Sequence, residues 1–301
     1  MNILLTGSSG FLGQYIKALY LKRDDNLFTI GRSKENNSII DLSKSIVGLD
    51  RRNFDIVIHS AGKAHIVPKT EKEKLEFYSI NVRGSENLLK SLELSNTLPK
   101  YFIFISTIAV YGLVTGKQIS ENTPLNAKDS YGYSKILAEQ LIHEWCDRNN
   151  VLLTILRLPL VIGKNPVGNL KKMIDGIRQG FYVNIDGGIA SKSMVLAEDV
   201  ANFIPNVYNV GGIYNLTDGE HPTLLNISKH IADSLGKKHP YNIPKYFAFF
   251  LSKIGNLIGD RFPINSDKLL KITSDLTFDD SKARTVANWN STPVLEDFKI
   301  L

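Results

Sequence analysis

The chain has 301 residues and a formal net charge of +6, with 43% hydrophobic and 22% charged residues. This composition is typical of one large globular unit or two closely joined domains, and it argues against intrinsic disorder. No window contains the roughly 18 consecutive apolar residues that a membrane-spanning helix needs. The single cysteine, Cys146, excludes an internal disulfide and a cysteine-rich metal site, so we expect a small core residue there and no metal.

The positive charge raises the question of a nucleic-acid partner. The lysines are dispersed and are not interleaved with aromatic residues, so phosphate-bearing small molecules explain the charge at least as well. The N-terminal stretch MNILLTGSSG lacks the basic region and cleavage site of a signal peptide. We therefore expect a cytoplasmic protein that binds no nucleic acid and does not insert into a membrane.

The first half of the chain alternates strand-like and helix-like segments. Continuous apolar runs at 2–6, 27–31, 38–40, 54–62, 101–107 and 151–163 are typical of strands buried in a parallel sheet. Apolar residues at helical spacing predict helices at 11–23, 73–94 and 130–150. This order predicts a doubly wound α/β fold, with a Rossmann dinucleotide-binding domain over residues 1–163.

The pattern becomes less regular after Gly163. We expect a smaller C-terminal substrate lobe formed by 164–189 and 218–301, with 190–217 returning to the first domain. The stretch 244–262 is markedly apolar but contains Ser252, Lys253 and Asn256. For this stretch a packed helix or a lid is favoured over a helix lying on a membrane surface.

A glycine-rich loop, TGSSGFLG, follows the first strand and opens the first helix. Residues without Cβ allow a tight turn and let a pyrophosphate approach the backbone at the helix N-terminus. The position at the start of the alternating series makes the signal specific for a dinucleotide. The expected cofactor residues in this loop are Gly7, Gly10, Phe11, Leu12 and Gly13.

The second strand ends in Arg32, where an NAD-specific site normally offers an acidic residue to the adenine ribose. An arginine can bind a 2′-phosphate through charge-assisted hydrogen bonds, which favours NADP over NAD. Alternatively, Arg32 is a solvated loop residue and both cofactors bind. Asp41, Leu42 and Ala61 follow later strands and complete the expected cofactor site.

The stretch SYGYSK contains two tyrosines ahead of a lysine. Residues four apart share a helix face, so Tyr131 can lie beside Lys135, whereas Tyr133 points elsewhere. Free tyrosine has a pKa of about 10, and a neighbouring ammonium favours the phenolate. We expect Tyr131 to move a proton and Lys135 to lower its pKa and to contact the cofactor.

The strand at 101–107 ends in hydroxyl side chains at the edge of the sheet where ligands of such folds bind. Thr107 is the expected catalytic hydroxyl, which orients the reacting oxygen, and Ser106 is an expected substrate contact. Either hydroxyl can instead cap the local backbone.

In order along the chain, TGSSGFLG, HSAG, INVRGSENLL, STIAVYG, YGYSK, RLPLVIG and SMVLAEDVA resemble the extended short-chain dehydrogenase/reductase family. LTFDDSKARTVANW resembles its C-terminal signature. The resemblance implies NAD(P)-dependent chemistry on sugar nucleotides and a catalytic trio of Thr107, Tyr131 and Lys135. The helices at 73–95 and 131–149 resemble those that pair in the family's homodimers.

Departures from the family's sequence patterns reduce the number of reactions that the chain can be expected to catalyse. The 4,6-dehydratases carry an Asp-Glu pair where this chain has Ile108 and Ala109, and the 4-epimerases carry an asparagine where it has Leu160. Asn169 is then the expected diphosphate contact, together with Lys192 and Arg157. PLVIG and HSAGKAHIV resemble bacterial 4-ketoreductases of UDP-linked 6-deoxy-N-acetylhexosamines.

Two other functions stay open. A 4-epimerase would use the same residues with tightly held NAD. A non-catalytic dinucleotide sensor on the same fold is the alternative from another class, although such proteins often lose the tyrosine or the lysine that this chain retains.

Overall fold

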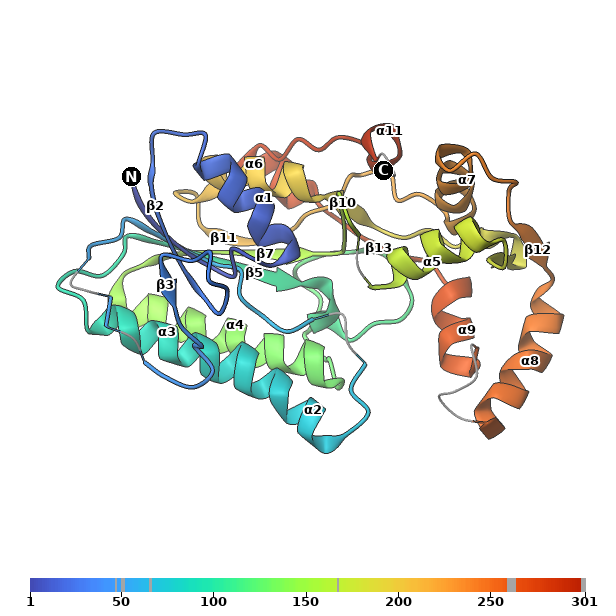
Figure 1. The fold of residues 1–301 in the computed structure, drawn as a ribbon, viewed down its shortest axis with the longest axis horizontal. Helices are drawn as coiled ribbons and strands as arrows, with labels where there is room; N and C mark the ends of the chain where they lie inside the picture. Colours follow the sequence, from blue (N-terminus) through green and yellow to red (C-terminus); the bar gives the residue numbers. More distant parts are fainter. Residues whose placement is uncertain (47, 50–51, 65–66, 167, 259–263, 299–301) are drawn as a thin grey trace.

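The computed structural model describes residues 1–46, 48–49, 52–64, 67–166, 168–258 and 264–298. A parallel seven-stranded sheet lies between two layers of helices (Figure 1). Its strands, in spatial order, are β11 (Gly212–Asn215), β7 (Leu152–Leu158), β5 (Tyr101–Thr107), β4 (Ile56–His59), β1 (Asn2–Thr6), β2 (Asn26–Gly31) and β3 (Ser38–Ile39). The predicted doubly wound parallel sheet is confirmed.

Successive residues of β1 supply the two faces of this sheet, because side chains alternate along a strand. Ile3 and Leu5 pack in the core beneath α1 (Phe11–Tyr20) and α6 (Ala197–Val207). Leu4 packs in the core on the opposite face, which is covered by α3 (Gly84–Glu93) and α4 (Ser130–Asn149). Both faces are therefore buried, which explains the continuous apolar strands in the sequence.

The long helix expected at 73–94 has three parts. These are α2 (Glu71–Phe77), a π-helical stretch η1 (Tyr78–Arg83) and α3. A π turn adds a residue to the local repeat and often lies at a functional site. Here it carries Asn81, whose contacts are described with the site.

The run expected as one strand at 151–163 is two strands, because Pro159 follows β7 and cannot donate to the sheet ladder. The second strand, β8 (Leu160–Ile162), pairs with β10 (Met194–Leu196). β11 lies at the edge of the main sheet, beside β7, so part of 190–217 does return to it. The division of the chain into two domains stays a prediction.

The remaining elements form the smaller lobe and its links to the sheet (Figure 1). Two more pairs of short strands are β9 (Val183–Ile185) with β12 (Tyr241–Ile243), and β6 (Gly116–Ile119) with β13 (Leu276–Phe278). The helices are η2 (Ile108–Tyr111), α5 (Gly168–Gln179), η3 (Asp186–Gly188), α7 (Leu224–Ser234), α8 (Lys245–Ile258), α9 (Ser266–Thr273), α10 (Ser281–Ala287) and α11 (Val294–Asp297). A separate core joins α5 and α7, with Ile174 and Ile231 at its centre.

The apolar stretch 244–262 forms α8, and its residues 259–262 lie outside the described part. The helix packs on one face only, since Ala248 is buried while Tyr246 and Phe250 are mostly exposed, and the alternative of a lid stays a prediction. Within the described residues, no helix is both long and apolar enough to cross a bilayer.

Candidate active site

The glycine loop turns tightly between β1 and α1. Gly7 has φ +74°, and a Cβ on it would lie 2.5 Å from the amide nitrogen of Ala61. A Cβ on Gly13 would lie 1.9 Å from the carbonyl oxygen of Gly7, so α1 packs directly on the loop. No side chain caps the N-terminus of α1, and its first turn contains no acidic residue. The loop therefore presents backbone amides and the positive helix end to an anion, as a pyrophosphate requires.

A pocket of about 520 Å³ lies beside this loop at the carboxyl ends of β1, β2 and β4. It brings together most of the predicted cofactor residues, namely Gly7, Gly10, Arg32, Asp41, Leu42 and Ala61. Phe11, Leu12 and Gly13 belong to α1 and do not line it. Its shape and its glycine cradle fit a dinucleotide.

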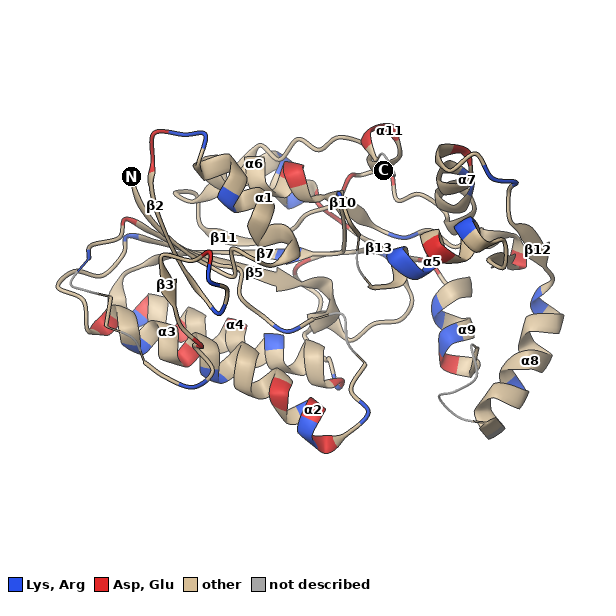
Figure 2. Cartoon of the chain, viewed as in Figure 1, with Lys and Arg blue, Asp and Glu red and all other residues tan. Residues whose placement is uncertain are grey.

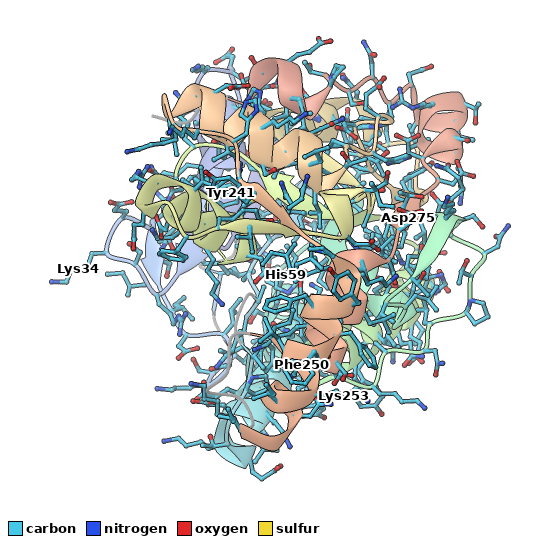
Figure 3. All side chains as sticks on the ribbon, turned by 90° about the vertical axis from the view of Figure 1, so that its right-hand side faces the viewer. Lys34, His59, Tyr241, Phe250, Lys253 and Asp275 are labelled. Atoms are coloured by element: carbon cyan, nitrogen blue, oxygen red, sulfur yellow. The ribbon has the colours of Figure 1, made fainter. Side chains whose placement is uncertain are left out.

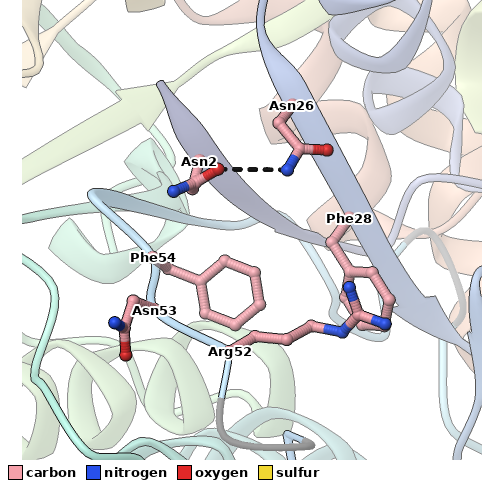
Figure 4. Close-up of a pocket in the computed structure, with 6 residues that line it drawn as sticks. All are labelled: Asn2, Asn26, Phe28, Arg52, Asn53 and Phe54. Carbon is pink, nitrogen blue, oxygen red and sulfur yellow. Dashed lines mark hydrogen bonds between the residues drawn. The ribbon is translucent and has the colours of Figure 1, made fainter.

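A second pocket, of about 290 Å³, lies at the opposite edge of the sheet (Figure 4). It is lined by Asn2 and Asn26, the first residues of β1 and β2, and by Arg52, which stacks on the Phe28 ring. Ligands of doubly wound sheets bind at the carboxyl ends of the strands, so this pocket is not the cofactor site.

Arg32 is exposed at the rim of the cofactor pocket. Asp41 faces the same pocket, and its Oδ1 accepts hydrogen bonds from the amide and the hydroxyl of Ser43 at 3.1 and 2.7 Å. The Ser43 hydroxyl, assisted by Lys44 and Arg32, holds the pKa of Asp41 below its usual range. No ion pair joins Arg32 to an acid among the residues that the structure describes, so its guanidinium can bind a phosphate.

Thr107 and Tyr131 meet between the end of β5 and the first turn of α4. The Thr107 hydroxyl accepts from the amide of Ala109 at 3.2 Å, and a side-chain hydrogen bond joins it to the Tyr131 phenol. Burial raises the pKa of Tyr131, and the bond from Thr107 opposes that rise. Tyr133, two residues further along the helix, is 52% exposed.

Lys135 lies one turn further along α4 and is 5% exposed. Its Nζ donates to the carbonyl oxygen of Ile105 at 2.7 Å and lies 3.8 Å from the centre of the Phe104 ring. Burial lowers the pKa of Lys135 to about 7. The expected lowering of the Tyr131 pKa by Lys135 is therefore wrong for the protein without cofactor. Burial is the largest influence on the pKa of both groups, and the ammonium of Lys135 donates to Ile105.

Gly132, the glycine between the two tyrosines, allows the close approach of α4 to the end of β5. A Cβ there would lie 2.5 Å from Cβ of Ala127 and 2.7 Å from the carbonyl oxygen of Ala109. Asp129 caps the helix by accepting from the amides of Tyr131 and Gly132. Sequence reasoning missed this role, although a glycine inside a helix is itself a signal of close packing.

A buried chain of hydrogen bonds supports the floor of the site. Thr6 Oγ1 lies 2.6 Å from His59 Nδ1, and His59 Nε2 lies 2.9 Å from Ser85 Oγ. Ser85 donates its proton to the carbonyl of Asn81, so His59 Nε2 donates and Nδ1 accepts. Burial, with Lys135 nearby, lowers the pKa of His59 to about 3, so the imidazole is neutral.

Asn81 connects this chain of hydrogen bonds to α4. Its Nδ2 donates to Ser134 Oγ at 2.8 Å, and its Oδ1 accepts from the amide of Lys63 at 2.7 Å. Ser134 in turn donates to the carbonyl of Tyr131. The π turn of η1 thus places the Asn81 side chain between the loop after β4 and the first turn of α4.

Ser106 and Arg157 belong to a different buried cluster. The Ser106 hydroxyl donates to Glu139, which also forms an ion pair with Arg157 at 2.7 Å. Arg157 donates to the hydroxyl of Tyr111 at 3.1 Å, and Tyr111 donates to Asn215 at 2.7 Å. Both predicted substrate residues are thus engaged with protein partners, and their contact with a substrate stays a prediction.

The two other predicted substrate residues lie in the smaller lobe. Asn169 is exposed in the first turn of α5. Lys192 is half-buried, and its Nζ donates to the carbonyls of Lys271 and Ser274 at 2.8 and 2.7 Å. Lys192 therefore caps the C-terminus of α9 in this structure, while its role toward a diphosphate stays a prediction.

The parallel sheet and the glycine cradle define a dinucleotide-binding fold, and the Thr107–Tyr131 pair lies at the carboxyl end of its sheet. A model of the NAD-dependent epimerase/dehydratase family matches residues 3–216. The chain belongs to this family, which confirms the predicted family, an enzyme of its class, and a nicotinamide dinucleotide as cofactor.

Two similar proteins are full-length relatives. The chain is 26% identical to the N-acetyl-alpha-D-glucosaminyl-diphospho-ditrans,octacis-undecaprenol 4-epimerase of Escherichia coli O157:H7, over 94% of this chain and 89% of that protein. It is also 26% identical to a UDP-glucose 4-epimerase of Vibrio cholerae, over 98% and 92% of the two chains.

Solved structures share the fold at lower identity. The UDP-glucuronic acid 4-epimerase of Bacillus cereus, in complex with NAD, has a TM-score of 0.76 at 20% identity and covers 99% of this chain and 96% of that chain. RMD of Pseudomonas aeruginosa, complexed with NADPH, has a TM-score of 0.75 at 20% identity with the same coverage.

Proposed function

We propose that the protein transfers hydride at C4 of a nucleoside-diphosphate sugar, reducing a UDP-linked 4-keto-6-deoxy-N-acetylhexosamine for surface polysaccharide biosynthesis. The observation that carries this proposal is the contact between Thr107 and Tyr131. The two residues that follow Thr107 are Ile108 and Ala109, which cannot move a proton. A dehydratase needs an acid and a base at that point, whereas a C4 reductase needs one proton donor.

Tyr131 is assigned the proton transfer to the C4 oxygen. A raised pKa keeps its phenol protonated before the reaction, as a proton donor requires. Thr107 donates to the Tyr131 oxygen, which stabilises the phenolate that remains after the transfer. The nicotinamide supplies the hydride when bound. Binding of the remote nucleoside diphosphate would provide the positioning, and Asn169 and Lys192 are its proposed contacts.

The choice of NADP over NAD is also proposed. Arg32 is exposed at the pocket rim and suits a 2′-phosphate, and the end of β2 offers no carboxylate for ribose hydroxyls. Ser33 lies beside it on the same wall. The pyrophosphate of the cofactor would be held by Gly7, Gly10 and Ala61. Lys135 would hold the nicotinamide ribose.

A second candidate is 4-epimerisation of a sugar carried on a diphosphate. The names of the two full-length relatives favour it, and one of them acts on a sugar linked through diphosphate to undecaprenol. An epimerase returns the hydride to the same sugar, so it needs no external reductant.

One assay separates the two candidates. Purified protein is incubated with NADPH and a panel of UDP-linked 4-keto sugars, and absorbance at the reduced-nicotinamide band is followed. The reductase consumes NADPH only when a 4-keto sugar is present. Interconversion of two UDP-sugars without added NADPH, by protein that carries stoichiometric NAD, would establish the epimerase instead.

We also propose a homodimer that pairs through α2, α3 and α4. Leu75 of α2, Tyr78 of η1 and Tyr133 of α4 are 67%, 49% and 52% exposed, which suits an apolar contact. Sedimentation equilibrium should give twice the chain mass, and Tyr78→Asp should shift the mass toward one chain. A single-chain mass for the unmodified protein would overturn this expectation.

A further inference from the structure

Helix α8 exposes an aromatic face. Its aromatic side chains are each half exposed or more, at 76% for Tyr246, 49% for Phe247, 53% for Phe249 and 63% for Phe250. Tyr241, in the strand just before it, is 79% exposed. Figure 3 looks onto this end of the molecule and shows Phe250 and Lys253 on the outer side of the helix. Contiguous exposed apolar surface of this kind marks a binding surface.

The helix contacts the protein through its small residues. Ala248 is 1% exposed and Ser252 is fully buried, with its hydroxyl donating to the carbonyl of Phe249. Ala248 and Ser252 are four apart and share the inner face, while Tyr246 and Phe250 are four apart and share the outer face. An ordinary surface helix has the reverse pattern, with the large apolar residues inward.

The segment that carries this face is basic. Residues 236–275 contain six lysines, one arginine and three aspartates. The net charge of this segment is therefore +4, out of +6 for the whole chain. Helix α8 carries two lysines and no acidic residue (Figure 2). Lys245 forms an ion pair with Asp186 at 3.3 Å, and Lys253 is exposed. Lys253 lies 5.0 Å from the centre of the Phe249 ring. Aromatic rings framed by lysines are the pattern of a helix lying in the interface of an anionic bilayer.

We propose that the outer face of α8 seats the smaller lobe on an anionic phospholipid surface. Tyr246 and Phe250 enter the headgroup region, and Lys253, with the exposed Lys271 of α9, contacts lipid phosphates. A second copy of the chain brings the same positive charge to the face, whereas anionic lipid complements it. In this proposal the helix lies on the bilayer surface and does not cross it.

Flotation of the full-length protein with vesicles tests the proposal. Vesicles of phosphatidylglycerol and phosphatidylethanolamine are compared with vesicles of phosphatidylcholine alone, without sugar or cofactor. The protein should float with the anionic vesicles, and binding should weaken as salt rises because the Debye length shrinks. Since no substrate is present, the result does not depend on the proposed reaction.

Matched variants assign the binding to α8. The double variant Tyr246→Ser/Phe250→Ser should lose about tenfold or more of its vesicle partition. The control Leu21→Ser/Leu94→Ser removes two side chains that are 67% and 66% exposed elsewhere, and it should bind like the unmodified protein. Lys253→Glu should weaken binding, and Lys22→Glu, on the first domain, should not. The Lys253→Glu result decides the matter if the aromatic variant fails to fold.

Three results would overturn the proposal. The first is no flotation of the unmodified protein with anionic vesicles, and the second is equal binding by the α8 variants and their controls. The third combines two observations: the unmodified protein does not bind vesicles, and the double variant has a lower mass in sedimentation equilibrium. That combination would assign the face to a second copy of the chain.

Discussion

The hydroxyl of Thr107, at the carboxyl end of β5, is hydrogen-bonded to the phenol of Tyr131 in the first turn of α4. This bond joins a strand end to a helix start that are separated by more than twenty residues in the sequence. It exists because Gly132 lets the helix approach the backbone of Ala109.

Thr107→Val should lower kcat by about 10- to 100-fold, since a hydrogen bond to a charged group contributes roughly 1.5–3 kcal/mol. Thr107→Ser keeps the hydroxyl that accepts from Ala109 and donates to Tyr131, so it should retain most of the activity. Steady-state kinetics with a 4-keto sugar nucleotide measure both. Full activity of Thr107→Val together with a loss in Thr107→Ser would show that the methyl group, not the hydroxyl, matters.

Tyr131→Phe should cut turnover by about 10²- to 10⁴-fold, as is typical of losing a general acid. Cofactor affinity, measured by fluorescence titration, should not change, because the cofactor pocket lies beside the glycine loop. Tyr133→Phe is the matched control, and its exposed ring should leave turnover intact. Full activity of Tyr131→Phe would reject the assignment of the proton donor.

Gly132→Ala should displace α4 from the end of β5 and separate Thr107 from Tyr131. The added Cβ would lie 2.7 Å from the backbone oxygen of Ala109, which cannot rotate away. Overpacking typically destabilises a protein by about 1–3 kcal/mol, and we expect kcat to fall as well. Gly48→Ala, with no atom within 4 Å of the new Cβ, is the control in urea denaturation and kinetics.

Arg32→Asp should reverse the preference between the two cofactors. It removes the proposed phosphate contact and adds a carboxylate that suits ribose hydroxyls and repels a 2′-phosphate. The ratio of kcat/KM for NADPH to that for NADH should fall by about tenfold or more. Lys34→Asp makes the same charge change at an exposed neighbour that does not line the pocket (Figure 3), and it should alter the ratio little.

The pKa of Lys135 predicts a pH dependence of stability in the protein without cofactor. The folded pKa of about 7 lies below the ordinary value of 10.5, so between these values the unfolded chain binds more protons. The unfolding free energy contributed by this residue therefore rises with pH from about 7 to 10.5, by at most about 1.4 kcal/mol per unit. Urea denaturation at pH 7, 8 and 9 should show this rise relative to Lys135→Met. Parallel curves for the two proteins would contradict the buried, low-pKa lysine.

The sequence was sufficient to predict the parallel sheet and the helix that carries Tyr131 and Lys135. Helical spacing also separated Tyr131 from Tyr133, since only local geometry is involved. Similarly, the glycines at 7, 10 and 13 indicated the dinucleotide site because a tight strand-to-helix turn needs them.

Long-range contacts could not be predicted in the same way. Ser106 and Arg157 look like free ligands in the sequence, yet Glu139 binds both from another element. The π turn that aims Asn81 at Ser134 has no local signal strong enough to predict it. Exposure of the aromatic residues of α8 was missed because an apolar helix pattern does not reveal which faces are covered.

Isotopic labelling follows the proposed transfer of hydride from the nicotinamide to C4 of the sugar. NADPH deuterated at the transferring position is incubated with a UDP-linked 4-keto-6-deoxy-N-acetylhexosamine, and the product is examined by proton NMR. We predict deuterium at C4 of the sugar, and the labelled product should form about 10²- to 10⁴-fold more slowly with Tyr131→Phe. A product without deuterium at C4, or NADPH left unoxidised across the panel of 4-keto sugars, would contradict it.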